Sequence, residues 1–182
     1  MRWSEERRAK EHMTTFTIRR LVATDYPALG RFFEQHWGEA KMVVHGNLYL
    51  PHELEGFAAE ADEQWVGLVT FHHTGTTTEV MSLDSLRIGQ GIGTALMQAV
   101  ADQALAHGSS RLWLETTNDN THALRFFQKR GYTLAAIRRN AVEEARKIKP
   151  SIPLIGYHGI PIRDEIEFEL LLEHDQRPTT NV

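Results

Sequence analysis

Three alternating glycines, Gly89, Gly91 and Gly93, connect a strand-like run to a helical run within residues 82–96. Glycine allows a positive φ and lets the backbone approach a ligand closely. The first amides of a helix have no partner inside the helix and point outward, where they can bind phosphate oxygens. The spacing therefore predicts an anion site that accepts a pyrophosphate group.

Two common phosphate-binding loops are excluded by their spacing. A nucleotide P-loop ends in Gly-Lys-Ser/Thr, but Gly93 is followed by Thr94 and Ala95. The dinucleotide fingerprint requires Gly-x-Gly-x-x-Gly, whereas these glycines alternate. The alternative that stays open is a tight turn from strand to helix that binds nothing.

A second block lies downstream, at residues 115–132. It matches the pattern Asn-x-x-Ala-x-x-Phe-Tyr-x-x-x-Gly-Phe at Asn120, Ala123, Phe126, Phe127, Gly131 and Tyr132. Together with the glycine loop, it resembles the GNAT N-acetyltransferase family, over residues 15–172 of this chain. The resemblance implies an α+β fold in which helices flank a mixed, mostly antiparallel central sheet of six to seven strands, splayed between strands four and five. It also implies acetyl-CoA as the cofactor and acetyl transfer to an amine.

In that family the pantetheine arm of acetyl-CoA lies in the gap between strands four and five, and strand four corresponds here to residues 79–86. The implied cofactor-binding residues are Met81, Ser82, Leu83, Arg87, Gly89, Gln90, Gly91, Ile92, Gly93, Thr94, Asn120, Ala123, Phe126 and Phe127. Two positions depart from the family pattern. Ile88 stands where Arg or Gln usually opens the loop, so pyrophosphate binding rests on backbone amides. Phe127 replaces a tyrosine and has no hydroxyl to protonate a departing thiolate.

The implied reaction is direct attack of a neutral primary amine on the thioester carbonyl, while a backbone amide of strand four polarises the carbonyl oxygen. Deprotonating an alkylamine with a pKa of ~10.4 costs about 4 to 5 kcal/mol at pH 7, so a carboxylate base is useful. Glu79 is the first catalytic candidate, because strand alternation places it on the face of Met81 and Leu83. Asp84 is the second. A solvent-facing Glu79 and an Asp84 that anchors the loop amides are the alternatives.

The polar residues available to an acceptor are Tyr49, Tyr157, Arg163 and Asp164. Asp164 suits a cationic amine and Arg163 suits one that carries a carboxylate, so a small-molecule amine and an amino-acid-like acceptor both stay open. A rival function is a non-catalytic acyl-CoA-binding regulatory module of the same fold. A third is an interaction protein whose glycine loop binds nothing.

Composition narrows the function classes further. The 182 residues fit one domain, which we expect over residues 15–172, with an extension at 1–14 and a tail at 173–182. A net charge of -4 argues against nucleic-acid binding, and no apolar run is long enough to span a membrane. There is no cysteine, and the ten histidines show no metal-ligand spacing, so we expect mostly surface histidines and no metal. We expect a cytoplasmic monomer or homodimer.

The elements that position these residues follow from periodicity and end signals. We expect strands at residues 16–20, 42–50, 56–60, 64–73, 76–86, 111–116, 132–138 and 165–172, and helices at 24–37, 92–107, 120–130 and 141–149. Thr24 is the predicted N-cap of the first helix. In the last strand, apolar residues alternate with Glu165, Glu167 and Glu169, which predicts one buried face and one water-facing face. A proline-interrupted loop over 149–164 is long enough to be functional.

Overall fold

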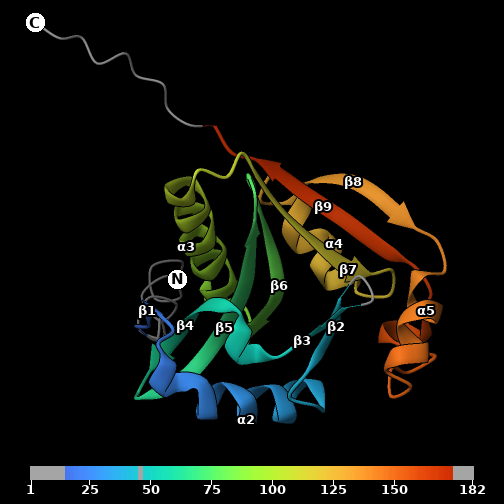
Figure 1. Cartoon of the computed structure of the whole chain (residues 1–182), viewed down its shortest axis with the longest axis horizontal. Coiled ribbons are helices and arrows are strands. Elements are labelled where there is room, and N and C mark those ends of the chain that lie inside the picture. The colour runs from blue at the N-terminus through green and yellow to red at the C-terminus, as the bar shows by residue number, and fades with distance from the viewer. Residues whose placement is uncertain (1–14, 45–46, 174–182) are drawn as a thin grey trace, which may run out of the picture.

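The core of the protein is a seven-stranded sheet with helices on both faces (Figure 1). The computed structural model describes residues 15–44 and 47–173. The strands are β1 (Thr17–Arg20), β4 (Glu55–Ala61), β5 (Gln64–Thr74), β6 (Thr77–Ser85), β7 (Arg111–Thr117), β8 (Thr133–Arg138) and β9 (Glu165–Leu171), in the spatial order β1-β4-β5-β6-β7-β9-β8. Only β6 and β7 pair in parallel among these neighbours. The predicted mixed, mostly antiparallel sheet is therefore confirmed.

Four described helices and a small hairpin complete the fold. The helices are α2 (Tyr26–Trp37), α3 (Ile92–His107), α4 (Thr121–Gln128) and α5 (Ala141–Ile148), and short 3-10 turns occupy Ala23–Asp25, Pro51–Glu53 and Tyr157–Gly159. The hairpin pairs β2 (Met42–Val44) with β3 (Asn47–Tyr49), where the sequence predicted a single strand. Every other predicted strand and helix is present, with ends that differ by at most two residues.

The sheet buries a separate apolar cluster on each face. Neighbouring residues of β5 show the division, because successive side chains of a strand point to opposite faces. Leu68 packs with Leu29 and Phe33 of α2, whereas Val69 packs with Leu96 of α3, and all five are fully buried. The helices α2 and α3 thus clamp the central strands from opposite sides.

The start of α2 differs from the prediction. Thr24 lies inside the 3-10 turn that precedes the helix, so it is not the N-cap. The carboxylate of Asp25 instead accepts a hydrogen bond from the Val22 amide at 2.8 Å and pairs with Arg19. The 3-10 turn before the helix moves the N-cap from Thr24 to Asp25, and Pro27 falls in the first turn of α2.

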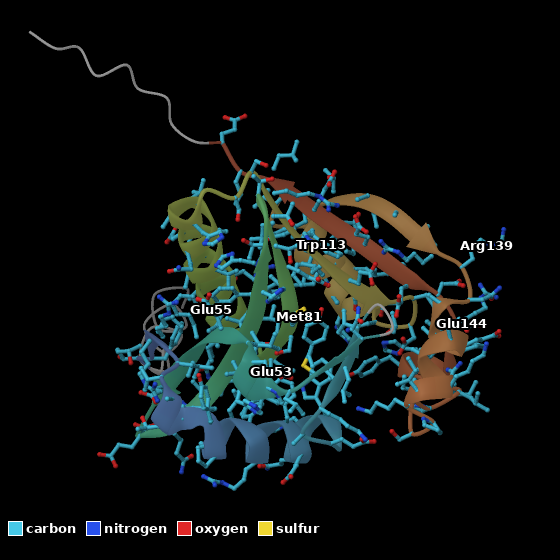
Figure 2. All side chains as sticks on the ribbon, in the orientation of Figure 1. Glu53, Glu55, Met81, Trp113, Arg139 and Glu144 are labelled. Carbon is cyan, nitrogen blue, oxygen red and sulfur yellow. The ribbon has the colours of Figure 1, made fainter. Side chains whose placement is uncertain are left out.

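A β-bulge at Met81 changes the faces of β6. The register with β5 shifts there, and Met81 has no opposite residue on β5. The extra residue reverses the alternation beyond it. Met81 packs in the cluster of α2, toward which it extends in Figure 2, whereas Leu83 packs against the cluster of α3. The prediction that Leu83 shares a face with Glu79 and Met81 is therefore wrong.

The glutamate face of β9 also differs from the prediction. Phe168 is fully buried as expected, but Glu167 on the opposite face is buried as well. Arg111 and Arg138 both donate hydrogen bonds to its carboxylate and cover it. The expected water-facing side is thus a packed ionic layer across β7, β9 and β8.

The sheet opens between β6 and β7. Their parallel register runs from Thr77 opposite Arg111 to Val80 opposite Leu114 and ends there, although both strands continue. In Figure 1, β7, β9 and β8 turn away from β6 beyond this point. These are the fourth and fifth strands of the main sheet in chain order, where the splay was predicted.

The predicted extension at 1–14 and all of the predicted tail except Glu173 lie outside the described residues. Among the helices of the described part, none combines the length and apolar character that crossing a bilayer requires.

Candidate active site

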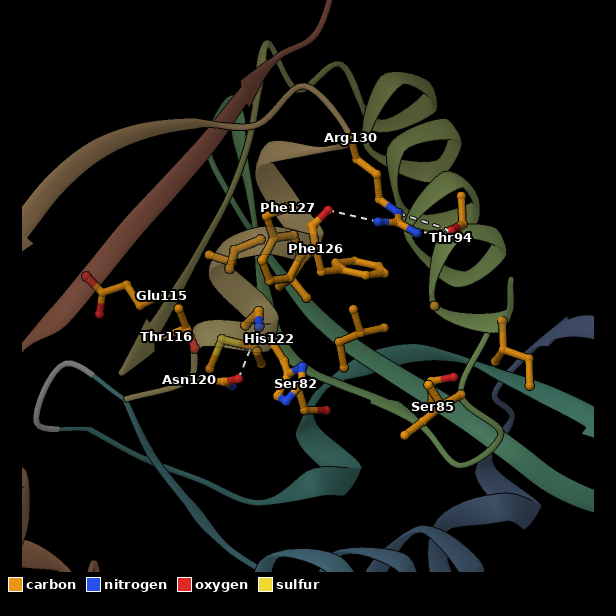
Figure 3. Close-up of a pocket in the computed structure, with 18 of the residues that line it drawn as sticks. Ser82, Ser85, Thr94, Glu115, Thr116, Asn120, His122, Phe126, Phe127 and Arg130 are labelled. Carbon is orange, nitrogen blue, oxygen red and sulfur yellow. Dashed lines mark hydrogen bonds between the residues drawn. The ribbon is translucent and has the colours of Figure 1, made fainter. Parts of the chain in front are cut away.

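The opening between β6 and β7 continues into a cavity of about 820 Å³ (Figure 3). Its walls are β6, the glycine loop with the start of α3, β7 and α4. The lining residues are Trp37, Val80, Met81, Ser82, Leu83, Ser85, Ile88, Gly89, Gly91, Ile92, Gly93, Thr94, Leu114, Glu115, Thr116, Asn120, His122, Ala123, Phe126, Phe127, Arg130 and Tyr157. Most of the predicted cofactor residues are thus brought together around one space.

The edge of β6 that borders the cavity presents free backbone groups. The Leu86 amide donates to a carbonyl of β5 at 2.9 Å, so this residue bonds toward β5. Alternate residues of an antiparallel strand bond toward the same neighbour, so Ser82 and Asp84 also face β5. Leu83 and Ser85 consequently direct their N–H and C=O groups to the opposite edge, where no strand of the described part pairs with β6 beyond Val80.

The glycine loop forms the end of the cavity at α3. Gly89 and Gly91 both have a φ of +81°, which side chains with a Cβ rarely adopt. The first hydrogen bond inside α3 runs from the Ala95 amide to the Gly91 carbonyl at 3.0 Å. The amides at the three preceding positions, residues 92–94, therefore have no acceptor within the helix. This geometry leaves three helix amides free at the position of the predicted anion site.

Arg130 supplies a positive charge at the same end of the cavity. Its Nε donates to the Thr94 hydroxyl at 3.0 Å and its Nη1 to the Phe126 carbonyl at 2.8 Å, and its Cζ lies 3.5 Å from the centre of the Phe126 ring. The side chain thereby ties the end of α4 to the start of α3. Sequence reasoning missed Arg130 because it occupies an unspecified position of the second motif. Its i+4 spacing from Phe126 was the available signal.

The start of α4 forms the opposite wall. The side-chain Oδ1 of Asn120 accepts from the Ala123 amide at 3.1 Å and caps the helix. Ala123, Phe126 and Phe127 follow on the face toward the cavity. The Phe127 ring is 5 % exposed and packs on Tyr132 and Phe168, with centroid distances of 5.5 and 5.8 Å. Phe127 is therefore part of the core as well as of the cavity wall.

Two of the predicted cofactor residues do not line the cavity. Arg87 pairs with Asp62 at 3.6 Å. Gln90 lies in the loop, but its side chain is not part of the lining. Their roles in cofactor binding stay predictions that the lining does not support.

The two predicted catalytic carboxylates also lie outside the lining. Glu79 is 9 % exposed and stands opposite His72 and Trp113, in the part of β6 that is paired on both sides. It is one residue short of the point where β6 and β7 separate. Its assignment as the base stays a prediction, and the structure does not bring it to the cavity.

Asp84 reaches the cavity only through another residue. Its carboxylate accepts from Trp37 Nε1, at 3.1 and 3.3 Å, and Trp37 lines the cavity. Burial raises the pKa of Asp84, and the Trp37 hydrogen bond and nearby His36 offset part of that rise. The structure thus gives Asp84 a contact with the end of α2. Sequence reasoning missed Trp37, because no motif links α2 to β6.

Glu115 is a cavity-lining carboxylate that sequence reasoning did not select. It pairs with Arg138, which also donates to Glu167 at 2.6 Å. Arg111 bridges Glu167 to Glu169 in the same layer. Burial alone would raise the pKa of Glu167, but the hydrogen bonds from Arg138 and Arg111 outweigh it and lower that pKa. One end of this ionic layer therefore reaches the cavity.

Only one of the four predicted acceptor residues lines the cavity. Tyr157 lines the cavity, whereas Tyr49, Arg163 and Asp164 do not. Tyr49 packs near His72, with a centroid distance of 6.1 Å. Arg163 and Asp164 pair with each other at 2.9 Å.

Asp164 has further contacts within its own loop. The pKa of the Asp164 carboxyl is lowered by the Arg163 guanidinium and by the Asn140 amide. The side-chain Oδ1 of Asn118 accepts from both the Arg163 and the Asp164 amides at 2.9 Å. These contacts hold the end of the long loop against the turn between β7 and α4. Acceptor binding by Arg163 and Asp164 stays a prediction.

Comparison with known proteins identifies the family to which this chain is similar. A sequence model of the Acetyltransferase (GNAT) family matches residues 17–132. The chain is 44 % identical over 143 residues to "Uncharacterized protein YdhI" of Bacillus subtilis (strain 168), covering 78 % of this chain and 89 % of that one. It is 46 % identical over 136 residues to "Uncharacterized protein YxbD" of the same organism, covering 74 % and 86 %.

Solved structures share the fold. A GNAT family acetyltransferase from Elizabethkingia anophelis with acetyl-CoA bound has a TM-score of 0.62 at 21 % identity, covering 86 % of this chain and 98 % of that one. The ribosomal-protein-S18-alanine N-acetyltransferase of Escherichia coli has a TM-score of 0.64 at 20 % identity, covering 90 % and 98 %. The family match spans both motifs that line the cavity, so the chain belongs to the acetyltransferase (GNAT) family.

Proposed function

We propose that this protein is an acetyl-CoA-dependent N-acetyltransferase that moves an acetyl group to a primary amine by direct attack. The acceptor is a small molecule or an amino-acid-like compound. One observation carries the proposal: the gap between β6 and β7 and the glycine loop form a single cavity of about 820 Å³. A cytoplasmic location and a monomeric or homodimeric state belong to the same proposal.

The residues present fit acetyl-CoA along the length of this cavity. The unpaired amides at 92–94 and the Arg130 guanidinium suit the pyrophosphate, because both supply positive potential at one end. The open β6 edge at Leu83 and Ser85 suits the amide groups of the pantetheine arm, which bond as an added strand would. Asn120, Ala123 and Phe126 wall the arm on the side of α4.

Bound acetyl-CoA supplies a thioester, whose carbonyl is open to attack and whose sulfur leaves as a thiolate. This chain polarises the carbonyl oxygen with a backbone amide of β6, and Leu83 N–H is the first that faces the gap beyond the paired segment. A fixed amide aimed at developing negative charge costs no reorganisation during the reaction.

An amine acceptor is supported by the acetyltransferase family to which the chain belongs and by the name of one structural neighbour. The Escherichia coli protein is, by its name, an alanine N-acetyltransferase. A relative in Streptomyces lavendulae, 32 % identical over 85 residues that cover 47 % of this chain and 41 % of that one, is named streptothricin acetyltransferase. The names of these two proteins specify different acceptors. We therefore apply only the class of reaction, acetyl transfer, to this chain.

The test is calorimetric titration with acetyl-CoA, followed by an assay of free thiol release. The assay offers 1,4-diaminobutane, glycinamide and an alanine-initiated peptide, each against a blank without amine. We expect saturable binding and amine-dependent thiol release. Binding without release to any amine would favour the regulatory module, which the absence of a hydroxyl on Phe127 also suits. No binding would refute the proposal.

A further inference from the structure

The cavity lining holds few groups that can exchange a proton near pH 7. Among the residues described, only Glu115, His122, Arg130 and Tyr157 combine a position in the lining with a titratable side chain. Arginine and tyrosine ordinarily keep their protons at neutral pH. A residue that accepts a proton from an amine in this cavity is therefore Glu115 or His122.

The carboxylate of Glu115 is already engaged. It pairs with Arg138, and its side chain is 9 % exposed. Figure 3 shows it pointing away from the other labelled residues of the cavity. The Arg138 guanidinium in turn binds Glu167, so this carboxylate belongs to the ionic layer behind β7. Glu115 therefore points out of the cavity and is already bound by Arg138.

His122 differs from Glu115 in both its exposure and its hydrogen bonding. It lies in the first turn of α4, two residues after Asn120, and its side chain is exposed to the cavity. Neither ring nitrogen is hydrogen-bonded to any residue in the described ranges. The ring instead contacts the rings of Tyr157 and His158. In the view of Figure 3, His122 and Ser82 lie at one end of the cavity, and Arg130 lies at the other.

The neighbouring loop holds this imidazole in place. Asp119 Oδ2 accepts from the Tyr157 amide at 3.0 Å, and a Cβ on Gly156 would lie only 1.9 Å from that oxygen. The turn is therefore seated directly against the residue before the α4 cap. Its rings then meet His122, Tyr157 edge-on at 6.4 Å and His158 tilted at 5.8 Å. The long loop thus fixes the surroundings of one histidine in the cavity.

We propose that His122 is the catalytic residue that carries the proton during acetyl transfer, an inference that rests on the proposed function. The acceptor first loses its ammonium proton to solvent. As its nitrogen bonds to the thioester carbon, the neutral imidazole takes a second proton from that nitrogen. The C–S bond then breaks, and the imidazolium returns this proton to the CoA sulfur. Amide, free thiol and neutral His122 result, and the thiolate is protonated although Phe127 has no hydroxyl.

The first test observes the imidazole itself and needs no acceptor. Histidine C–H signals are followed by NMR across pH with and without CoA, and His122 is assigned by its loss in His122→Asn. Because the proposal brings the CoA sulfur to this ring, we expect CoA to shift the His122 signal. The charged and titratable groups nearby are Glu115 on β7, Arg125 on α4, Asp119 before α4, and Tyr157 and His158 on the loop.

The second test is kinetic and uses an amine from the panel that the wild type acetylates. His122→Asn should lower kcat by about 100-fold or more, the usual contribution of acid–base catalysis, while acetyl-CoA affinity changes less than about threefold. Added imidazole should restore part of the activity of His122→Ala. The fall of kcat/KM in acid should become less steep in both variants, because only the protonation of the acceptor amine then remains to cause it.

The matched control is His52→Asn. His52 is an exposed histidine of the turn Pro51–Glu53, contacts the Tyr26 ring and does not line the cavity. We expect wild-type kcat and an unchanged pH profile. The inference is overturned if His122→Asn keeps wild-type turnover, or if CoA that binds by calorimetry leaves the His122 signal unmoved. A wild type that binds no acetyl-CoA refutes the proposed function instead.

Discussion

At the scale of single residues, the backbone of Gly91 determines the anion site. Its φ of +81° immediately precedes the free amides of α3. Gly91→Ala introduces about 1–2 kcal/mol of left-handed strain, which the loop relieves by moving those amides. We predict about tenfold weaker acetyl-CoA binding by calorimetry.

Gly75 is the matched control for this substitution. It has a φ of +58° in the turn between β5 and β6, and a Cβ there also meets nothing within 4 Å. Gly75→Ala should cost similar stability and leave acetyl-CoA affinity unchanged. Equal affinities of the two variants would contradict a role for the loop geometry in binding.

Asp84 makes stability depend on pH. Burial raises its pKa above the ordinary value of 3.8, so the folded state holds this proton to higher pH than the unfolded state. Stability therefore falls as pH rises from 3.8 through the folded pKa, and the loss persists at neutral pH. Asp84→Asn keeps an oxygen for Trp37 and removes the buried charge.

We predict that Asp84→Asn is more stable than the wild type at pH 7, and that the difference vanishes at a pH below 3.8. Urea unfolding at both pH values measures it. A variant that is less stable at pH 7 would show that the negative charge itself stabilises the fold.

At the scale of elements, the ionic layer joins β7, β9 and β8 through Glu167. Removing this charge leaves Arg111 and Arg138 with one carboxylate partner each. We predict that Glu167→Gln lowers the free energy of unfolding by about 1–2 kcal/mol at pH 7.

The pKa of Glu167 is lowered by its arginines, so its contribution is complete above the ordinary value of 4.5 and is lost as pH falls through the folded pKa. The deficit of Glu167→Gln should therefore shrink in acid. Glu165→Gln, on the same face of β9 but outside these ion pairs, is the control. If the loss of unfolding free energy did not change with pH, it would come from altered packing rather than from the missing charge.

Most elements could be predicted from the sequence because their signals are local. Apolar periodicity locates β5 and α3, and Gly108 marks the end of α3 with its φ of +89°. The bulge at Met81 was missed because its side chain fits strict alternation equally well, and only pairing with β5 reveals the extra residue. Burial of Glu167 was missed for a similar reason, since its arginines come from other strands.

At the scale of the whole molecule, the site combines residues of the two sequence motifs with residues that the fold brings from distant parts of the chain. The glycine loop and α4 were predictable because each motif is contiguous and carries its own geometry. Trp37, Glu115 and Tyr157 reach the same cavity from α2, β7 and the long loop. The prediction named Tyr157 only as an acceptor residue and did not select the other two. His122 was one of ten histidines that were expected to lie mostly at the surface, because nothing local distinguishes it from the other nine.

In the proposed complex, the cofactor lies along the open edge of β6. The most direct measurement is amide hydrogen exchange by NMR with and without CoA. We predict that the Leu83 and Ser85 amides, which face the gap, exchange more slowly when CoA is bound. The Ser82 and Asp84 amides, already bonded toward β5, should change little. Binding of CoA with no selective protection of Leu83 and Ser85 would contradict this account of the site.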